Sequence, residues 1–272
     1  MTISAKVILD SISPDGIRLT TLQLRFPKFL LAQFNTHRAF SRSSSSSRAI
    51  PVSRMIKDIR LDPVMPAAWL SGRPGMQPGG ELPAHASDVL EEEWYRVMDY
   101  ALEAASIMED HGAAKEIINR VIEPWAHCRV VVTASEWSNF FKLRLHGDAQ
   151  NEMRLLAQAM KSALDESTPT YLHHGEWHCP FVSDDEDMPL HLKKRVSAAR
   201  CARVSYLTHE GKIPSIEADL ALYDRLITSE PAHASPVEHL ATPDVATKNG
   251  WENLHLHGNF RGWQQWRKVL QL

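Results

Sequence analysis

The sequence Thr36-His37-Arg38-Ala39-Phe40-Ser41-Arg42-Ser43-Ser44-Ser45-Ser46-Ser47-Arg48 is the centre of this chain. It holds three arginines, one histidine and six serines within thirteen residues. Guanidinium groups and serine hydroxyls are common donors to phosphate oxygens, so the stretch predicts a site for an anion. A flexible serine-rich linker is the alternative interpretation. Apolar flanks at residues 26–35 and 49–52 weigh against it, because a linker rarely has core-like sequence on both sides.

The upstream sequence predicts a packed support for this stretch. Residues 26–35 (FPKFLLAQFN) read as a short buried helix, since proline suits a first helical turn and an apolar run follows. That helix would present His37 and Arg38 at its exit. Residues 5–26 read as a β-hairpin, because apolar segments flank a Ser-Pro-Asp-Gly turn at residues 13–16.

The composition is that of an ordinary globular protein. The chain has 272 residues, 43% of them hydrophobic and 23% charged, with a net charge of -3. This length can bury a full core, and we expect residues 1–272 to form a single domain. The basic character is local to the Ser/Arg stretch, so a small anionic ligand suits it better than a nucleic-acid polymer.

Cysteine usage and the N-terminus predict a cytoplasmic protein. The three cysteines are scattered at positions 128, 179 and 201, which argues against a disulfide framework and for a reducing compartment. The first residues carry no apolar signal core, and no run of about 20 apolar residues could span a bilayer. We therefore expect no membrane association.

The remaining patterns predict mostly helices. The clearest covers residues 87–110, and its expected core face repeats at three and four residues: Trp94, Val97, Met98, Ala101, Ala105 and Met108. The other expected elements are a loop over 61–85, a strand over 129–133, and helices over 113–122, from about 148, over 188–203 and over 215–229. The tail from residue 250 is too aromatic to be disordered.

Three other kinds of site are considered from the residues alone. Neutral imidazole and thiolate are good zinc ligands, and the cluster is His173, His174, His178 and Cys179. Adjacent histidines rarely bind one ion together, however, and no second pair stands at finger spacing, so we expect no metal. The glycines between residues 72 and 80 match no phosphate-loop spacing. A serine nucleophile is disfavoured because no Gly-x-Ser-x-Gly elbow is present.

Several segments together resemble the flavin-dependent thymidylate synthase family. That family carries Arg-His-Arg followed at fixed intervals by Ser, Asn-Glu, Ser and Arg. Here the frame reads Thr36-His37-Arg38, then Ser41, Ser43-Ser44, Ser46 and Arg48. The family's next block, an Asn-Phe-Leu-x-Leu-Arg-like run before Ala-Gln-x-Glu, is matched by residues 139–144 (NFFKLR) and 148–153 (DAQNEM). Residues 115–124 look like the helix that precedes that block.

Two more blocks match the family in a different order. They are Ala202-Arg203-Val204-Ser205-Tyr206 and His233-Ala234-Ser235-Pro236-Val237-Glu238-His239. In the usual family order such blocks precede the histidine-arginine motif, whereas here they follow it. The resemblance therefore implies a circular permutation, which is physically reasonable because domain termini often lie close together. Taken alone, the second block predicts only a helix cap or a tight turn, and Ser205 is ambiguous.

The chain departs from the family pattern around the ligands. Thr36 replaces the first arginine, Ser43 and Ser44 replace Asn-Glu, and Ala49 replaces a tyrosine. Asn119 stands where the family has a phosphate-binding arginine, with Arg120 adjacent. The change from threonine to serine at position 235 is mild.

The resemblance implies an α/β (α+β) fold, a sheet with long packed helices, in a circularly permuted order. It implies a transferase that methylates dUMP at C5 to give dTMP, taking carbon from methylenetetrahydrofolate and a hydride from reduced FAD, with NADPH as reductant. The family forms its sites between subunits, so a homotetramer is expected. Arg144 takes the catalytic role by this match, because a guanidinium against the pyrimidine stabilises the negative charge that develops there. No cysteine nucleophile is required.

The same resemblance assigns the remaining site residues. The nucleotide-binding set is Gln33, Ser46, Arg48, Arg120 and Arg144. The flavin-binding set is Thr36, His37, Arg38, Ser44, Asn139, His233 and Ser235. The departures leave open a hydroxymethyl product, another pyrimidine nucleotide, or a non-catalytic nucleotide-binding relative without flavin. A zinc hydrolase using His173, His178 and Cys179 is the alternative from a third class.

Overall fold

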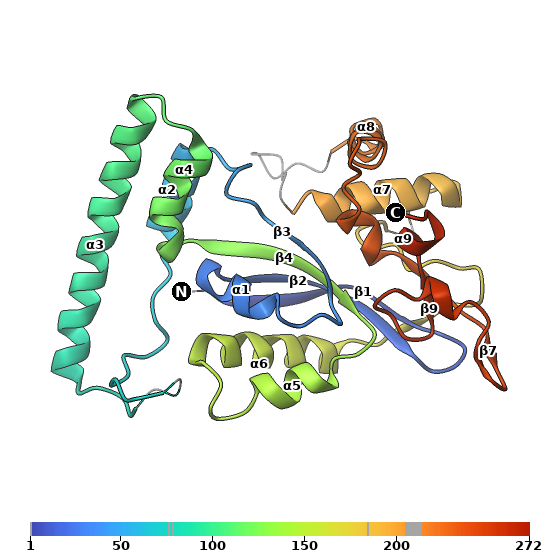
Figure 1. Cartoon of the computed structure of the whole chain (residues 1–272), viewed down its shortest axis with the longest axis horizontal. Coiled ribbons are helices and arrows are strands. Elements are labelled where there is room, and N and C mark those ends of the chain that lie inside the picture. The colour runs from blue at the N-terminus through green and yellow to red at the C-terminus, as the bar shows by residue number, and fades with distance from the viewer. Residues whose placement is uncertain (1, 76, 78, 184, 205–213) are drawn as a thin grey trace.

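The computed structural model describes residues 2–75, 77, 79–183, 185–204 and 214–272. A five-stranded sheet in the order β3-β4-β2-β1-β5 lies at its centre (Figure 1). The strands are β1 (Ser4–Ile12), β2 (Arg18–Pro27), β3 (Ser41–Ser44), β4 (His127–Ala134) and β5 (Thr170–Tyr171). Pairs among β1 to β4 are antiparallel, and β5 runs parallel to β1. The mixed α/β fold class predicted from the sequence is confirmed.

The predicted hairpin is formed by β1 and β2. Ser4 pairs with Arg25 at one end, and Ile12 pairs with Arg18 beside the turn. Gly16 in that turn has φ 74°, a left-handed conformation that glycine adopts without a Cβ clash. Successive strand residues point to opposite faces of a sheet, so alternate residues of β2 enter the main core.

One face of the sheet is covered by three helices. They are α1 (Leu31–Phe34), which continues the short helix η1 (Lys28–Leu30), together with α5 (Ser138–Arg144) and α6 (Asn151–Glu166). The predicted lead-in helix is therefore confirmed. The expected buried face of α6 is also found, with Met153, Leu156 and Met160 in the core and Ala163 packed at its margin. Figure 1 shows α5 and α6 running along this face.

A second core lies at one end of the sheet, among α2 (Val52–Leu61), α3 (Ala84–Asp110) and α4 (Lys115–Ile122). Met98 and Ala105 are buried there as predicted, whereas Trp94, Ala101 and Met108 are partly buried. The prediction for Val97 is wrong, because its exposed fraction is 52% and Leu102 is buried instead. Consecutive helical residues point about 100° apart, so Val97 turns to solvent when Met98 faces the core.

The C-terminal part of the chain builds a third core at the other end (Figure 1). It is formed by α7 (Leu190–Ala202), α8 (Ile216–Ile227), η3 (Ser235–His239) and α9 (Trp266–Val269). The strands β6 (Ala241–Pro243) and β9 (Trp263–Gln265) contribute to a smaller buried cluster beside it, in which Ala241 and Trp263 pack with Leu19 and Phe260. The short elements η2 (Glu123–Trp125), β7 (Ala246–Thr247), β8 (Gly250–Trp251) and η4 (Leu254–Leu256) complete the fold. Both late helices and the ordered tail are confirmed, since Trp263 and Trp266 are buried.

The remaining expectations concern the loop between α2 and α3, membrane helices and domain organisation. The described residues between α2 and α3 form no helix, as expected for the 61–85 loop. None of the helices in the described part of the chain is long and apolar enough to cross a membrane. The single-domain organisation stays a prediction.

Candidate active site

The serine-rich stretch is an edge strand of the sheet. Residues 41–44 form β3, which pairs with β4 on one side only among the described strands. Ser41, Ser43, Ser45 and Ser47 are buried. The linker interpretation is therefore wrong, because its hydroxyls are packed rather than solvated. Alternation along β3 points Ser43 toward the C-terminal part of the chain and Arg42 toward α1.

His37 and Arg144 come together at the start of this strand. Nε of Arg144 donates to Nε2 of His37 at 2.9 Å, so the proton of the neutral imidazole lies on Nδ1. Burial, followed by the charges of Arg144 and Arg42, lowers the pKa of His37 to about 4. The imidazole is therefore neutral at physiological pH and serves as an acceptor for the guanidinium.

Arg42 fixes the turn that presents His37. Its guanidinium Nη1 donates to the carbonyl oxygens of Asn35 at 2.9 Å and His37 at 3.0 Å, with a longer contact of 3.4 Å to Phe34. These carbonyls end α1, where helical carbonyls lack intrahelical partners and a cation is favoured. Sequence reasoning assigned no role to Arg42, although its place inside the motif was a signal.

A second group of predicted residues lies past the other end of β3. The half-buried Ser46 accepts a hydrogen bond from the backbone N–H of Arg48 at 3.3 Å. The exposed Arg48 guanidinium lies 3.7 Å from the Glu116 carboxylate on α4. Arg120 stands one turn further along α4 and is exposed, so it shares that face of the helix with Glu116. Ser46, Arg48 and Arg120 therefore belong to one neighbourhood.

Asn119 holds the backbone that follows Ser46 and Arg48 in place. It is fully buried, and Nδ2 donates to the carbonyls of Ser47 at 2.8 Å and Ile50 at 2.9 Å. Its Oδ1 is buried without a partner among the described atoms. Asn119 thus holds the segment after β3, and its amide nitrogen is engaged in both of these bonds.

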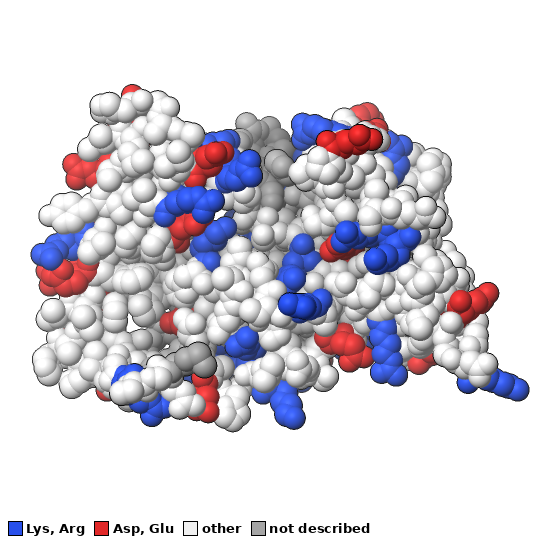
Figure 2. Space-filling model, in the orientation of Figure 1, with Lys and Arg blue, Asp and Glu red and all other residues white. Residues whose placement is uncertain are grey.

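The other predicted flavin-binding residues have differing accessibility. Thr36, Arg38 and Asn139 are exposed near the His37 turn, while Ser44 on β3 is half-buried. Thr36 donates to the carbonyl of Gln33 at 2.8 Å, which caps the turn. Arg38 pairs with no carboxylate of the described residues. Figure 2 shows several Lys and Arg side chains over the middle of this face, between α4 and α7.

His233 and Ser235 belong to the segment that crosses the opposite face of β3. Both are exposed; His233 lies just before η3, and Ser235 is its first residue. His239 at the end of η3 is buried and hydrogen bonded to Ser43 of β3 at 3.0 Å. The second C-terminal block thus lies against the serine strand. Ser205 and Tyr206 of the other block fall outside the described residues.

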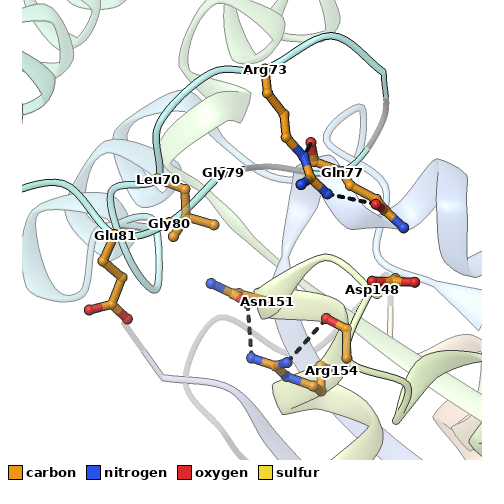
Figure 3. Close-up of a pocket in the computed structure, with 10 residues that line it drawn as sticks. Leu70, Arg73, Gln77, Gly79, Gly80, Glu81, Asp148, Asn151 and Arg154 are labelled. Carbon is orange, nitrogen blue, oxygen red and sulfur yellow. Dashed lines mark hydrogen bonds between the residues drawn. The ribbon is translucent and has the colours of Figure 1, made fainter.

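A separate pocket of about 260 Å³ lies between the 70–81 loop and the start of α6 (Figure 3). Arg154 donates to Asn151 at 3.0 Å, and Arg73 donates to Gln77 at 2.6 Å. Each arginine is therefore already hydrogen bonded to a residue on its own side of the pocket. Ligand pockets are usually about 300 Å³ or larger. We assign this pocket no ligand.

The residues of the zinc alternative are not assembled. His173 and His174 are exposed, whereas His178 is buried and bonded to Ser11 and Thr21. Within the described residues, no three His, Cys, Asp or Glu side chains are grouped to hold a metal ion. Burial raises the pKa of the Cys128 and Cys179 thiols to about 12 and also raises that of Cys201, so none is a reactive thiolate.

A family model described as Thymidylate synthase complementing protein matches residues 18–170, which is more than half of the chain. The chain belongs to this family. The matched segment contains the His37 motif and the Arg144 block, so the resemblance predicted from them is confirmed. His233 and Ser235 lie outside it. No curated protein matches this chain.

This chain also resembles solved structures. One is the UMP/dUMP methylase PolB from Streptomyces cacaoi bound with 5-Br dUMP, with a TM-score of 0.51 and 19% identity over 61% of this chain and 90% of that chain. The same methylase bound with 5-Br UMP gives a TM-score of 0.49 and 17% identity over 61% and 89%. At such identity, the first likeness shows that the fold is shared.

Proposed function

We propose that this protein methylates dUMP at C5 to form dTMP, using FAD, methylenetetrahydrofolate and NADPH. The observation that carries the proposal is the hydrogen bond between His37 and Arg144, because it joins the two family motifs at one edge of the sheet. Family membership supports the same chemistry. PolB, whose fold is shared, is a methylase of UMP and dUMP.

Arg144 is the proposed catalytic residue. C5 of a uracil ring is a poor nucleophile until negative charge develops on the ring, and a guanidinium placed against it stabilises that charge. Burial lowers the pKa of Arg144 from its ordinary value, yet that value is so high that the side chain stays cationic. His37, being neutral, orients this cation without neutralising it. The buried thiols leave no cysteine nucleophile, which agrees with a route through flavin.

The side chains near His37 fit a flavin by their chemistry. FAD supplies the hydride when bound, and the oxygens of its diphosphate accept hydrogen bonds from protein donors. Arg38 and Asn139 are exposed donors, and the buried indole Nε1 of Trp137 has no hydrogen-bond partner among the described residues. Unpaired buried donors are rare in folded proteins and often mark places that a ligand or water completes. We assign the flavin to Thr36, His37, Arg38, Ser44 and Asn139, with His233 just before η3 and Ser235 at its start.

The phosphate of the nucleotide is assigned to Ser46, Arg48 and Arg120. Their hydroxyl and guanidinium donors match phosphate oxygens. Gln33 is assigned to the pyrimidine, because its amide can both donate and accept, as a uracil edge does. Its Oε1 is buried without a partner in the described structure.

We further propose a homotetramer with sites completed between subunits. The exposed apolar side chains Val89, Val97, Tyr100 and Ile107 follow one face of α3, and Ile117 is exposed on the adjacent α4. Contiguous exposed apolar surface commonly marks a protein interface. A second copy of the chain is the occupant that the family suggests. The cytoplasmic location stays a prediction.

The circular permutation is also a proposal. Leu19 near the start of β2 and Ala241 just after η3 belong to one buried cluster. The end of η3 therefore lies beside the beginning of β2, and a short link could join them in the usual family order. This neighbourhood supports a chain whose blocks were reordered without changing their positions in space.

The test is turnover by the purified protein. It is incubated with dUMP, FAD, NADPH and methylenetetrahydrofolate, and the nucleotide is weighed by mass spectrometry. The proposal expects a product heavier by one methylene. A hydroxymethyl product would keep the site and change the reaction. Unchanged dUMP with bound flavin would point to another pyrimidine nucleotide, and unchanged dUMP without bound flavin would favour the non-catalytic relative.

A further inference from the structure

Two fully buried histidines are joined by a continuous row of hydrogen bonds through the sheet. The bonds link Ser11 Oγ to His178 Nδ1 (2.8 Å), His178 Nε2 to Thr21 Oγ1 (2.8 Å), Thr21 Oγ1 to Thr133 Oγ1 (2.7 Å), Thr133 Oγ1 to His239 Nδ1 (2.9 Å), and His239 Nε2 to Ser43 Oγ (3.0 Å). Four strands and two C-terminal segments therefore meet in one polar row, inside surroundings where an unpaired polar group is costly.

The proton count of this row favours a single direction. Each hydroxyl and each neutral imidazole carries one hydrogen to donate. Burial lowers the pKa of both His178 and His239 to about 3, so both rings are neutral and each must accept at one nitrogen and donate at the other. Hydrogen bonds in such a row polarise one another and hold the side chains in fixed orientations.

The two histidines occupy different places relative to the active site. His178 bridges β1 and β2, on the side of the sheet away from β3. His239 bridges β4 and β3 and ends the η3 segment that begins with Ser235. Ser43 is adjacent to Ser44 in β3. Gln265 also links β3 to η3, because its Nε2 donates to Ser41 Oγ and to the Glu238 carbonyl.

We propose that His239 is a positioning residue for the ligand site. It fixes η3 against the serine strand, and thereby holds Ser235 and Ser44 in one arrangement across the edge of the sheet. The inference rests on the proposed function, because it concerns ligands assigned to those residues. His178 belongs to the same row and has the same burial, but its side chain is hydrogen bonded to Ser11 and Thr21 on β1 and β2. Its backbone N–H donates to the Ala241 carbonyl after η3 at 2.8 Å, a bond that a change of the His178 side chain leaves in place.

The comparison of His239→Gln with His178→Gln tests this proposal. A carboxamide keeps hydrogen-bonding capacity but cannot reach both partners as a ring does, so each variant loses about one buried bond. FAD and dUMP dissociation constants are measured by calorimetry, with melting temperature and circular dichroism as controls for folding. We expect both variants to melt earlier. Only His239→Gln should bind FAD about tenfold more weakly, which is the size of one lost buried hydrogen bond, because Ser44 and Ser235 are assigned to the flavin.

Hydrogen exchange of the backbone amides gives a readout that needs no ligand. His239→Gln should speed exchange in residues 41–48, whereas His178→Gln should speed it in β1 and β2. Equal loss of affinity in both variants, or unchanged exchange in residues 41–48 of His239→Gln, would overturn the positioning role. If the unaltered protein binds neither FAD nor dUMP, the proposed function fails, and the exchange pattern still decides whether His239 fixes β3.

Discussion

Nε of Arg144 donates to Nε2 of His37 at 2.9 Å, although 107 residues separate them in the chain. The bond joins the exit of α1 to the last residue of α5. Because His37 is neutral, the guanidinium keeps its full charge while its orientation is fixed. The same contact explains why the pKa of His37 lies as low as about 4, since the Arg144 charge adds to the effect of burial.

Replacing Arg144 by alanine should reduce turnover by about a hundredfold or more, the scale seen when one charge-stabilising donor is removed. Flavin binding should remain. The pKa of His37, followed by NMR titration, should rise toward its ordinary value because a neighbouring cation is gone. Lys142→Ala, an exposed change on the same helix, is the control. Loss of flavin from Arg144→Ala would contradict the assignment.

Replacing Arg48 by alanine should weaken dUMP binding about tenfold or more, since a charge-assisted hydrogen bond to phosphate is lost. Turnover at saturating dUMP should change little. Calorimetry with dUMP measures the effect, and deoxyuridine, which lacks the phosphate, should bind both proteins equally. Arg96→Ala, another exposed arginine paired with a glutamate, serves as the control. An unchanged affinity for dUMP would remove Arg48 from the phosphate site.

Acid should destabilise the fold through its buried histidines. His178 and His239 have folded pKa values of about 3 against an ordinary 6.5, so between these values the unfolded chain binds more protons than the folded one. Stability therefore falls as pH falls from about 6.5, by up to about 1.4 kcal/mol per pH unit for each histidine. Carboxylates with lowered pKa values, such as Asp62 at about 2, add their loss only below about pH 4.

Urea denaturation at several pH values measures this slope. His178→Gln should flatten it, because one group no longer titrates between the two states. The exposed His85→Gln should leave it unchanged. A stability that stays constant from pH 6.5 to 4.5 would show that the buried histidines do not stay neutral in the folded protein.

The exposed face of α3 should carry a subunit interface. Tyr100→Glu combined with Ile107→Glu places two charges on that face, where burial without a partner is costly. Light scattering after gel filtration should then report a smaller particle than for the unaltered protein. Lys142→Glu, an exposed change on α5 that shifts the net charge in the same direction away from α3, is the control for altered charge. A single-chain mass for the unaltered protein would contradict the interface.

Local patterns in the sequence predicted most of the elements. The β2 alternation and the turn at Gly16 specified the hairpin, and the spacing of Met153, Leu156 and Met160 specified the core face of α6. The prediction for Val97 was wrong because the spacing of apolar residues along α3 outlines a stripe wider than the helix face that packs in the core. These signals are local, so a single chain displays them directly.

The contacts between residues far apart in the chain could not be predicted from these local patterns. The serine strand is polar by composition, and its pairing with β4 together with its contacts to His239 and Gln265 explains why its hydroxyls are buried. Thr21 and Thr133 look like ordinary strand residues until they meet across two strands. The Arg42 contacts depend on how the chain turns after α1. Family resemblance indicated the His37 and Arg144 motifs, but their contact is a fact of the fold.

The most direct measurement uses dUMP carrying deuterium at C5. The protein is supplied with FAD, NADPH and methylenetetrahydrofolate, and the nucleotide is analysed by mass spectrometry. Substitution at C5 must replace the hydrogen there, so we expect a methylated product that has lost its deuterium, and no such product from Arg144→Ala. Complete retention of deuterium and unchanged mass, with FAD and dUMP both bound, would contradict the claim that this site methylates dUMP.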